Sequence, residues 1–293
     1  MEKYLFTEVR RQIKDGQSGA EVWETADGRV LKYVRRESLP DPEMFRQYQN
    51  EAYFYRYFKE NSRERLRCLP EVLEVQVSDQ EILILMKKYR KLFLEESNEE
   101  LLGRIMGALA EIHAGKVPAV LKKERKQPGY LTKEQIEDCR AGWLSVLAEH
   151  PGVFDEKILE EAGANINEII GWHEKEARVL THGDFHRDNL LQGENGEILV
   201  CDWQGVGEGG ASGDISFFLS RLGADGVGIE PEKAVALYCR ERAGLTGETV
   251  SSGELLRHMQ AANLITSFQF WHEYLHGSSS GRVREVYGKM VMD

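Results

Sequence analysis

The first 90 residues alternate apolar and polar positions in short runs that end at turn-forming residues. Three strands are predicted between residues 8 and 34, because two glycine-containing turns interrupt the alternation there. Residues 42–59 begin with a proline and repeat aromatic residues at helical spacing, which predicts a helix. Two further strands are predicted at residues 72–77 and 81–86. The pattern therefore places five strands and one helix in this part of the chain.

Beyond Tyr89 the period of the apolar positions changes from that of strands to that of helices. An apolar stripe predicts a helix over residues 98–114. Further helices are predicted at residues 132–149 and 155–176, from Ile215, from Pro231, and at residues 255–274 as the terminal helix. Residues 205–213 instead hold five glycines, a density that predicts a flexible or tightly turned loop rather than a strand.

Composition places the chain among globular proteins. Its 293 residues suffice for one large domain or for two lobes around a cleft, and 41% are hydrophobic against 30% charged. The first residues lack the apolar core of a signal peptide, and no run approaches the length of a membrane span. The four cysteines are scattered without a CxxC pair, which argues against a zinc site and a disulfide framework. We therefore expect a cytoplasmic protein with no membrane partner.

The formal net charge of −11 narrows the class of partner. An acidic surface repels phosphate backbones, so a general nucleic-acid binder is disfavoured. Two interpretations of the charge stay open: it attracts a cationic substrate, or it only maintains solubility.

One stretch, residues 180–204, combines oxygen-bearing side chains at spacings that chemistry can use. Asp184 lies in a His-Gly-Asp turn, Asn189 follows in the same loop, and Asp202 ends an apolar run. Between them, Asn195-Gly196 with apolar residues on either side predicts a two-residue hairpin. That hairpin would fold Asp202 back beside Asn189.

Phosphoryl transfer is the chemistry that suits this arrangement. Its transition state needs a carboxylate to orient and deprotonate the attacking hydroxyl, and magnesium to neutralise the phosphate oxygens. Magnesium prefers oxygen ligands and usually takes only one or two of them from the protein. Asp184 is therefore the candidate catalytic base, and Asn189 with Asp202 are the candidate magnesium ligands. The alternative is an ordinary turn followed by a strand-end cap.

The sequence around these residues also matches a known pattern. Residues 182–189, His-Gly-Asp-Phe-His-Arg-Asp-Asn, resemble the HGDxHxxN catalytic loop of the aminoglycoside phosphotransferase/choline kinase family. Residues 202–204, Asp-Trp-Gln, resemble that family's metal-binding tripeptide, the counterpart of Asp-Phe-Gly in protein kinases. The resemblance implies that Asp214 braces the catalytic loop, which His182 and His186 also support.

The same resemblance implies a nucleotide site in the first 90 residues. Lys32 stands at the interval of the family's phosphate-binding lysine, and Glu51 matches the helical glutamate that pairs with it. Backbone groups near the end of the fifth strand would bond the adenine edge. The nucleotide-binding candidates are Lys32, Glu51, Gly16, Ser18, Gly19, Met86, Lys87 and Lys88. An ordinary hairpin turn and a solvated lysine would give the same local pattern.

For the whole chain, the resemblance implies an α+β, bilobal protein-kinase-like fold. A small antiparallel β lobe with one helix, residues 1–88, would bind nucleotide, and a larger, mainly α-helical lobe, residues 89–293, would carry catalysis and the acceptor. The implied activity is a phosphotransferase with ATP and Mg²⁺ as cofactors and a hydroxyl of a small molecule as acceptor. The short segment 205–213 offers little surface for a peptide, which disfavours a protein kinase. A pseudokinase-like module that binds nucleotide or metabolite without turnover is the alternative.

Two departures from the family pattern bear on the acceptor. Gln204 stands where many members carry glutamate, and Asp-Trp-Gln resembles the ecdysteroid-kinase-like branch, which puts an aminoglycoside substrate in doubt. Arg187 adds a positive charge beside the catalytic loop. It would steady the transferred phosphate or a substrate anion, or simply pair with Asp188.

The acceptor itself stays open. Trp271 and Glu273 are the candidates for holding a choline-like or amine-like cation, by cation–π and charge attraction. Aminoglycosides, other antibiotics, choline-like amines and other hydroxylated metabolites all fit the pattern. The choice between ATP and GTP, the oligomeric state, and a role in resistance or in metabolism are also open.

Overall fold

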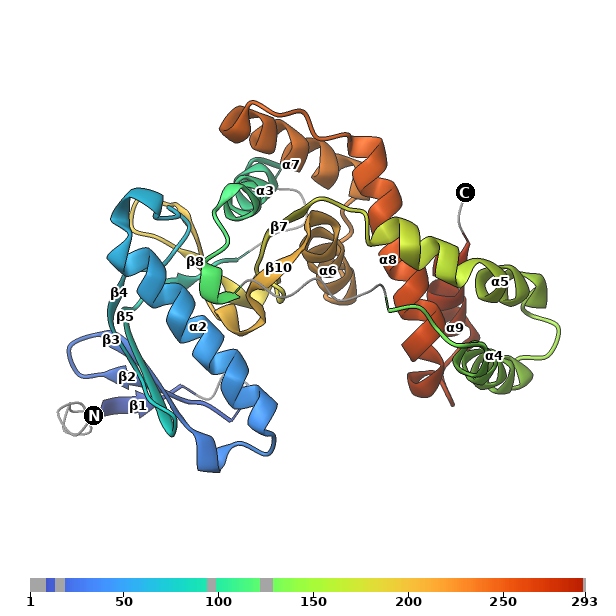
Figure 1. Cartoon of the computed structure of the whole chain (residues 1–293), viewed down its shortest axis with the longest axis horizontal. Coiled ribbons are helices and arrows are strands. Elements are labelled where there is room, and N and C mark those ends of the chain that lie inside the picture. The colour runs from blue at the N-terminus through green and yellow to red at the C-terminus, as the bar shows by residue number, and fades with distance from the viewer. Residues whose placement is uncertain (1–8, 14–18, 94–98, 122–128, 292–293) are drawn as a thin grey trace. The chain divides into compact units, whose positions relative to one another are not determined.

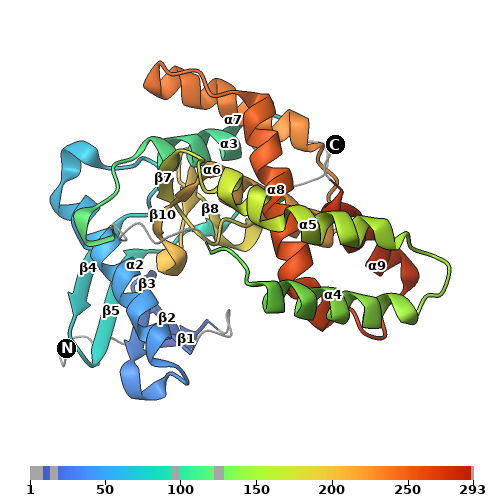
Figure 2. The ribbon, with the colours of Figure 1, turned by 45° about the vertical axis from the view of Figure 1, so that its right-hand side comes forward.

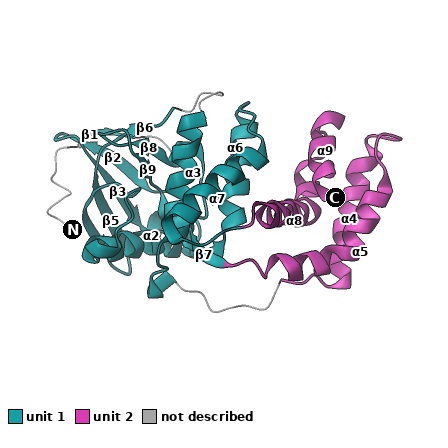
Figure 3. Ribbon diagram, turned by 90° about the horizontal axis from the view of Figure 1, so that it is seen from above, with its two compact units in different colours: residues 1–123, 178–250 teal, residues 124–177, 251–293 magenta. Residues whose placement is uncertain are grey.

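The computed structural model describes residues 9–13, 19–93, 99–121 and 129–291. The chain divides into two compact units, each built from two separate segments of sequence (Figure 3). Unit 1 comprises residues 1–123 and 178–250, and unit 2 comprises residues 124–177 and 251–293. The lobe boundary expected at residues 88 and 89 falls inside unit 1 and stays a prediction.

A five-stranded sheet forms the N-terminal part of unit 1, with the spatial order β1-β2-β3-β5-β4 (Figure 1). Its strands are β1 (Val9–Gln12), β2 (Glu21–Thr25), β3 (Arg29–Arg35), β4 (Val72–Val77) and β5 (Glu81–Lys87). Every pair of neighbouring strands is antiparallel. The strands that the alternation predicts are therefore present, and they form one small antiparallel sheet.

Helix α2, Pro42–Glu60, packs against this sheet (Figures 1 and 2). The Asp41 side chain accepts a hydrogen bond from the Glu43 N–H at 2.8 Å and so caps the helix start. Pro42 supplies the fixed φ that a first turn needs. The buried side is mostly aromatic: Phe45, Tyr48, Phe54, Tyr55 and Phe58. Glu51 is fully buried on the same helix, so its carboxylate requires a partner.

The rest of unit 1 combines helices with two small sheets. One sheet has the order β6-β8-β9, and the other pairs β7 with β10. The strands are β6 (Arg90–Lys91), β7 (Arg178–Thr181), β8 (Leu190–Gln192), β9 (Ile198–Val200) and β10 (Gly207–Gly210). The helices are α3 (Glu99–Ala114), α6 (Ala211–Ala224) and α7 (Pro231–Thr246). Helix α3 packs against α7 and also contacts β7 and β9.

The glycine-rich segment after Asp202 differs from its prediction. Instead of an irregular loop, β10 pairs antiparallel with β7, from Gly207 opposite Thr181 to Gly210 opposite Arg178. The prediction was wrong because main-chain hydrogen bonds need no side chain, and the local sequence does not reveal the partner strand. A Cβ atom at Gly209 would lie 3.3 Å from the Thr181 side chain, so glycine allows the close approach.

Unit 2 is a helical domain around one apolar core. Its helices are α4 (Lys133–Ala148), α5 (Glu156–His173), α8 (Ser252–Phe270) and α9 (Ser280–Tyr287). Helix α8 contacts both α4 and α5 (Figure 2). Each helix contributes a fully buried side chain: Trp143, Ile166, Phe268 and Val283. Both sequence segments thus share one core, and each covers the apolar side of the other.

The end of the chain is a second departure from prediction. The helix predicted at residues 255–274 is not terminal: α8 ends at Phe270, a 3₁₀ turn follows at Trp271–Tyr274, and α9 then forms. The Ser279 side chain accepts from the Arg282 N–H at 3.3 Å and caps α9, a signal that the serine- and glycine-rich residues around it obscure. Neither these helices nor any other among the described residues has the length and apolarity needed to cross a membrane.

Candidate active site

Strand β7 leads into the turn His182-Gly183-Asp184, and Asp214 holds that turn in place. The Asp214 carboxylate accepts hydrogen bonds from the His182 N–H at 2.7 Å and from the Gly183 N–H at 2.9 Å. The His113 ring, near the end of α3, lies 3.2 Å from the same carboxylate. Burial opposes ionisation of Asp214, but the hydrogen bond with His113 and the charges nearby lower its pKa. Asp214 is therefore an ionised, buried carboxylate that fixes the main chain of the loop.

The His182 imidazole is held in one tautomer by two hydrogen bonds. Its Nδ1 accepts from the Asp184 N–H at 3.2 Å, so its Nε2 carries the proton and donates to the Cys201 C=O at 3.0 Å. The ring is fully buried, and desolvation lowers the pKa of His182. A neutral His182 thus ties the catalytic loop to the residue that follows β9.

Gly183 is required by the close approach of two main-chain segments. It has a φ of 79°, and a Cβ atom there would overlap the carbonyl of Gly205. A Cβ atom on Gly205 would in turn lie 2.9 Å from the Gly183 carbonyl carbon. Only glycine fits at either position without moving the loop.

The Asp184 side chain is oriented through one of its oxygens. Its Oδ2 accepts from the Asn189 amide nitrogen at 3.2 Å and lies 3.5 Å from the His186 Nε2. The same Asn189 nitrogen donates to the Asp184 C=O at 2.9 Å. The side chain is 44% exposed, and among the described residues both contacts fall on Oδ2. Within the part of the chain that the structure describes, Oδ1 is therefore the Asp184 oxygen without a contact.

The hairpin predicted around Asn195-Gly196 forms, but its loop has three residues instead of two. Strands β8 and β9 pair antiparallel, and beyond their last pair the Gly193 N–H donates to the Glu197 C=O at 2.9 Å. Residues 194–196 then close the loop, with Gly196 in the left-handed region at φ 84°. The two-residue prediction was wrong because the strand register places Gly193 opposite Glu197, which leaves three residues between them.

The hairpin brings Asp202 next to Asn189, since the Cys201 N–H donates to the Asn189 C=O at 3.0 Å. Asp202 has φ 65° and ψ 65°, and it is the only non-glycine residue with positive φ among the described residues. This backbone is unfavourable for an L-residue and persists only where the surroundings fix it, as at many functional sites. It turns the chain sharply after β9.

Lys32 of β3 forms the centre of a buried ionic group. Its Nζ lies 2.7 Å from the Glu51 Oε2 and 2.7 Å from the Asp202 Oδ1. It also lies over the Tyr48 ring, 5.0 Å from the centroid. Burial disfavours the charged ammonium, but the two carboxylates outweigh it and raise the pKa of Lys32. The expected Lys32–Glu51 pair is present, and Asp202 joins it.

The oxygens left at Asp202 and Asn189 suit a magnesium ion. Burial opposes ionisation of Asp202, but the Lys32 ammonium lowers its pKa, so it is a carboxylate. Lys32 and the Gln204 amide, which donates at 2.5 Å, both bind Oδ1. Oδ2 has no partner among residues that the structure describes, so it is the oxygen left for a metal. Because Asn189 uses its amide nitrogen on Asp184, its amide oxygen is left as well. One carboxylate and one amide oxygen match the hard ligands that magnesium prefers.

The glycine loop between β1 and β2 is only partly described. Gly16 and Ser18 lie outside the described residues. Gly19 is exposed with a φ of 75°, and a Cβ atom there would lie 2.8 Å from the Leu39 side chain. Its conformation is therefore one that glycine adopts most readily.

The candidates for the adenine contact lie at the end of β5. Met86 and Lys87 belong to that strand, and Lys88 follows it. The Lys87 ammonium lies 2.8 Å from Glu194, and the Lys88 ammonium lies 2.9 Å from Glu24. Both lysine side chains thus have carboxylate partners, and an adenine contact here would use main-chain groups.

Arg187 has a carboxylate partner other than the one expected. Its guanidinium lies 3.1 Å from Asp225, while Asp188 lies 4.0 Å from Arg221. The hypothesis of an Arg187–Asp188 pair is therefore wrong. Asp225 follows α6 and is distant in sequence, so no local pattern indicates it.

The aromatic candidate in unit 2 already faces a cation. The Arg282 guanidinium lies over the Trp271 ring, 5.1 Å from its centroid. This is the position that a substrate cation was expected to take. Glu273 is exposed in the same 3₁₀ turn.

Two residues that support the site were not predicted. Trp203 is fully buried, and its main-chain N–H donates to the Glu51 Oε1 at 3.2 Å. The Tyr238 hydroxyl of α7 lies 2.8 Å from the His113 Nδ1 and so orients the ring that contacts Asp214. The tryptophan beside Asp202 is a signal that the sequence offers, whereas Tyr238 lies in a helix with no motif.

Solved structures of phosphotransferases share this fold. An aminoglycoside phosphotransferase from Alicyclobacillus acidocaldarius subsp. acidocaldarius superposes with a TM-score of 0.62 at 12% identity, over 99% of this chain and 90% of that one. The ADP-bound aminoglycoside phosphotransferase APH(2'')-Ib superposes with a TM-score of 0.55 at 15% identity, over 99% of this chain and 94% of that one. A macrolide 2'-phosphotransferase from Brachybacterium faecium superposes with a TM-score of 0.52 at 13% identity, over 97% of this chain and 92% of that one. The expected α+β, protein-kinase-like fold is confirmed.

The sequence itself identifies the family. A model of the phosphotransferase enzyme family matches residues 9–247, and the chain belongs to that family. The expected enzyme class, a phosphotransferase that acts on a hydroxyl group, is confirmed. No curated protein matches the chain at the sequence level. The resemblance to the ecdysteroid-kinase-like branch stays a prediction.

Proposed function

We propose that the protein is an ATP- and magnesium-dependent kinase that transfers the γ-phosphate to a hydroxyl of a small molecule. One connected set of contacts in unit 1 supports this most. It runs from Glu51 through Lys32 to Asp202, and from there across the β8–β9 hairpin to Asn189 and Asp184. A phosphate-binding cation, two metal-type oxygens and a carboxylate base thus lie in one site, as phosphoryl transfer requires.

Asp184 is the catalytic base in this proposal. Its Oδ1 orients the acceptor hydroxyl and takes the proton as the hydroxyl oxygen bonds to the γ-phosphorus. The bond from that phosphorus to the β–γ bridging oxygen breaks, and ADP leaves with the electron pair. Asn189 and His186 hold the other oxygen of Asp184, so the carboxylate keeps its orientation.

Lys32 binds the phosphates of the nucleotide in this proposal, and Glu51 keeps its ammonium in place. Glu51 is fully buried and bonded to the Trp203 N–H, so it forms a fixed anchor. Asp202 and Asn189 would hold Mg²⁺, which when bound neutralises the phosphate oxygens. Gln204 bonds the Asp202 Oδ1 with its amide, so it positions the ligand without adding a charge.

The acceptor in this proposal is a hydroxylated small molecule. Solved structures with this fold include a streptomycin–ATP–APH(2'')-IIa ternary complex and a spectinomycin phosphotransferase in complex with ADP and spectinomycin. An aminoglycoside, another antibiotic, a choline-like amine and another hydroxylated metabolite are the classes to compare. The net charge of −11 would suit a cationic member of these classes, and it also has the alternative role of maintaining solubility.

The test measures acceptor-dependent ADP release by the purified full chain with ATP and Mg²⁺. The panel comprises amino-sugar antibiotics, macrolides, choline-like amines, pentoses and sterols. We expect release above the acceptor-free background for one class, with the phosphorylated acceptor identified by mass spectrometry. Repeating the assay with GTP, and with EDTA in place of Mg²⁺, tests the two cofactor assignments separately.

The Asp184→Asn variant separates catalysis from binding in the same assay. We expect it to bind ATP like the wild type and to lose turnover. Nucleotide binding without turnover by the wild type on every acceptor would instead favour a pseudokinase-like module. Absence of nucleotide binding by the wild type would contradict both assignments.

A further inference from the structure

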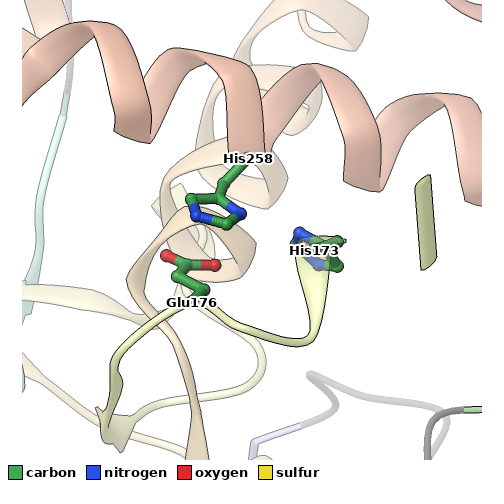
Figure 4. Close-up of side chains that lie close together, drawn as sticks. All are labelled: His173, Glu176 and His258. Carbon is green, nitrogen blue, oxygen red and sulfur yellow. The ribbon is translucent and has the colours of Figure 1, made fainter. Parts of the chain in front are cut away.

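Three potential metal ligands lie close together in unit 2, at a place with no part in the proposed phosphotransfer (Figure 4). His173 is the last residue of α5, Glu176 lies in the turn that follows, and His258 projects from α8. The Glu176 N–H donates to the His173 C=O at 3.0 Å and closes that turn. One potential ligand atom from each residue lies within 4.8 Å of the others.

Both histidine rings hold a buried nitrogen that lacks a partner. His258 is only 4% exposed. Neither its Nδ1 nor the Nδ1 of His173 has a hydrogen-bond partner among the described residues. Buried polar atoms are nearly always bonded, so two such atoms beside one carboxylate point to a shared ligand. A cation that accepts a lone pair from each ring would satisfy both.

The rings are suited to donate lone pairs. The Trp172 ring stacks on the His258 ring, with centroids 4.0 Å apart and planes at 14°, and so fixes its orientation. A neutral imidazole is the form that binds metals.

We propose that His173, Glu176 and His258 bind a transition-metal ion, with Zn²⁺ strongly preferred over Mg²⁺. Two imidazoles and one carboxylate suit zinc, whereas magnesium takes oxygen ligands. With bonds of about 2.0–2.2 Å, neighbouring ligands of tetrahedral zinc lie roughly 3.3–3.5 Å apart. One ligand atom of each residue already lies within 4.8 Å of the others, so movement of the partly exposed His173 and Glu176 toward His258 closes the site. A water molecule takes the fourth position.

The ion would join the two sequence segments that make up unit 2. His173 and Glu176 end the segment 124–177, and His258 belongs to the segment 251–293. The metal would therefore hold the end of α5 against α8. The scattered cysteines argue against a zinc site built from thiolates, and this cluster uses none of them.

The test is metal binding by the full chain after treatment with a chelator. Zn²⁺ affinity is measured by competition with a chromophoric chelator, and Co²⁺ serves as a spectroscopic probe of the same site. We expect one ion per chain, visible Co²⁺ bands of tetrahedral intensity, and a higher unfolding temperature with Zn²⁺ but not with the same concentration of Mg²⁺. Absence of Zn²⁺ binding by the wild type would overturn the proposal.

Two ligand variants at partly exposed positions locate the site. His173→Gln and Glu176→Gln should each weaken Zn²⁺ binding by about 100-fold or more, while the helical circular dichroism stays that of the wild type. His258→Ala should have the same effect on binding. Wild-type affinity in both His173→Gln and Glu176→Gln would overturn the proposal.

His276→Gln is the matched control. His276 is exposed in the same unit, and its Nδ1 lies 2.7 Å from Glu149, so this pair is the competing surface site. We expect wild-type Zn²⁺ affinity in this variant. Loss of binding in His276→Gln with retention in His173→Gln would assign the ion to the surface pair and contradict the proposal.

Discussion

The two regions of this molecule that gather potential ion ligands differ in how the chain assembles them. In unit 1, Asn189 and Asp202 stand at the two ends of one hairpin, and their oxygens are oriented by bonds to Asp184 and Lys32. In unit 2, His173 and His258 come from separate segments, and their buried ring nitrogens lack partners among the described residues.

The difference shows what each region is built to do. In unit 1 the groups already satisfy one another, so the site keeps its geometry without an ion and offers oxygen atoms that are held in place. In unit 2 the Nδ1 atoms of His173 and His258 have no partner among the described residues, and an ion bound between the rings would supply one. The first arrangement suits an ion that enters and leaves with a nucleotide, and the second suits an ion that stays.

The largest expected effect is on the turnover number, and it tests whether catalysis in unit 1 is independent of the metal site in unit 2. Asp184→Asn should lower the turnover number about 10³-fold, because an amide takes no proton from the acceptor hydroxyl. Unit 2 should bind Zn²⁺ as before. Steady-state kinetics measure the turnover number, and chelator competition on the same preparation measures Zn²⁺ binding. Asp188→Asn is the control, because Asp188 is an exposed carboxylate in the same loop. Comparable turnover in Asp184→Asn and wild type would contradict the assignment of the base.

Lys32→Met tests whether the ionic group in unit 1 holds itself together. Removing the ammonium leaves the Glu51 carboxylate buried and unpaired, which should reduce the free energy of unfolding by about 3–5 kcal/mol. The double variant Lys32→Met/Glu51→Leu removes the unpaired carboxylate but also the acceptor of the Trp203 main-chain N–H, so it should recover part of that loss and remain inactive. Chemical denaturation measures both.

Lys116→Met provides the control for that pair of variants. Lys116 pairs with Glu64 at the surface of unit 1, so its loss should leave the denaturation midpoint close to that of the wild type. Equal stability of the single and double variants would show that Glu51 is not held by Lys32.

Gly183→Ala tests the close approach of two main-chain segments in unit 1. The added Cβ atom meets the Gly205 carbonyl, and the positive φ disfavours alanine, so we expect destabilisation by about 1–3 kcal/mol with loss of activity. Thermal unfolding and ADP release are the measurements. Gly213→Ala in α6, where nothing lies within 4 Å of the new atom, should be neutral or slightly stabilising.

The smallest expected effect is a dependence of the free energy of unfolding on pH. The folded-state pKa of His182 lies below the ordinary value of 6.5 because the ring is buried. As the pH falls below 6.5, the His182 ring takes up a proton in the unfolded chain before it does so in the folded chain. The free energy of unfolding therefore decreases, by at most about 1.4 kcal/mol per pH unit. Above pH 6.5 both forms are neutral and this contribution is fully present. His182→Gln, which keeps a donor for the Cys201 C=O, should flatten the dependence between pH 6.5 and 5, as measured by denaturation midpoints. An unchanged slope would exclude His182 as its source.

The sequence predicts the local arrangement of residues 180–204 because the information for it lies within that segment. Asp184 and Asn189 share one loop, and the apolar runs around Asn195-Gly196 are enough to bring Asp202 to them. The pairing of Lys32 with Glu51 was inferred from a family resemblance, and the structure places their charged atoms 2.7 Å apart.

The features that were missed depend on partners distant in sequence. β10 forms because β7 lies beside it, and Arg187 turns to Asp225 because α6 ends there. The proposed metal site in unit 2 was missed for the same reason. His173 and His258 belong to no sequence motif, and they come together only because α8 packs on α5.

The interleaving of the two units sets an order of events during synthesis on the ribosome. Helices α4 and α5 emerge early, but the helices that cover Trp143 and Ile166 emerge only after the whole catalytic region. Until then the nascent chain carries an uncovered apolar surface, which is what chaperones and proteases recognise. Helices α8 and α9 therefore have to be made before this apolar surface is covered, although they lie far in sequence from the residues assigned to catalysis.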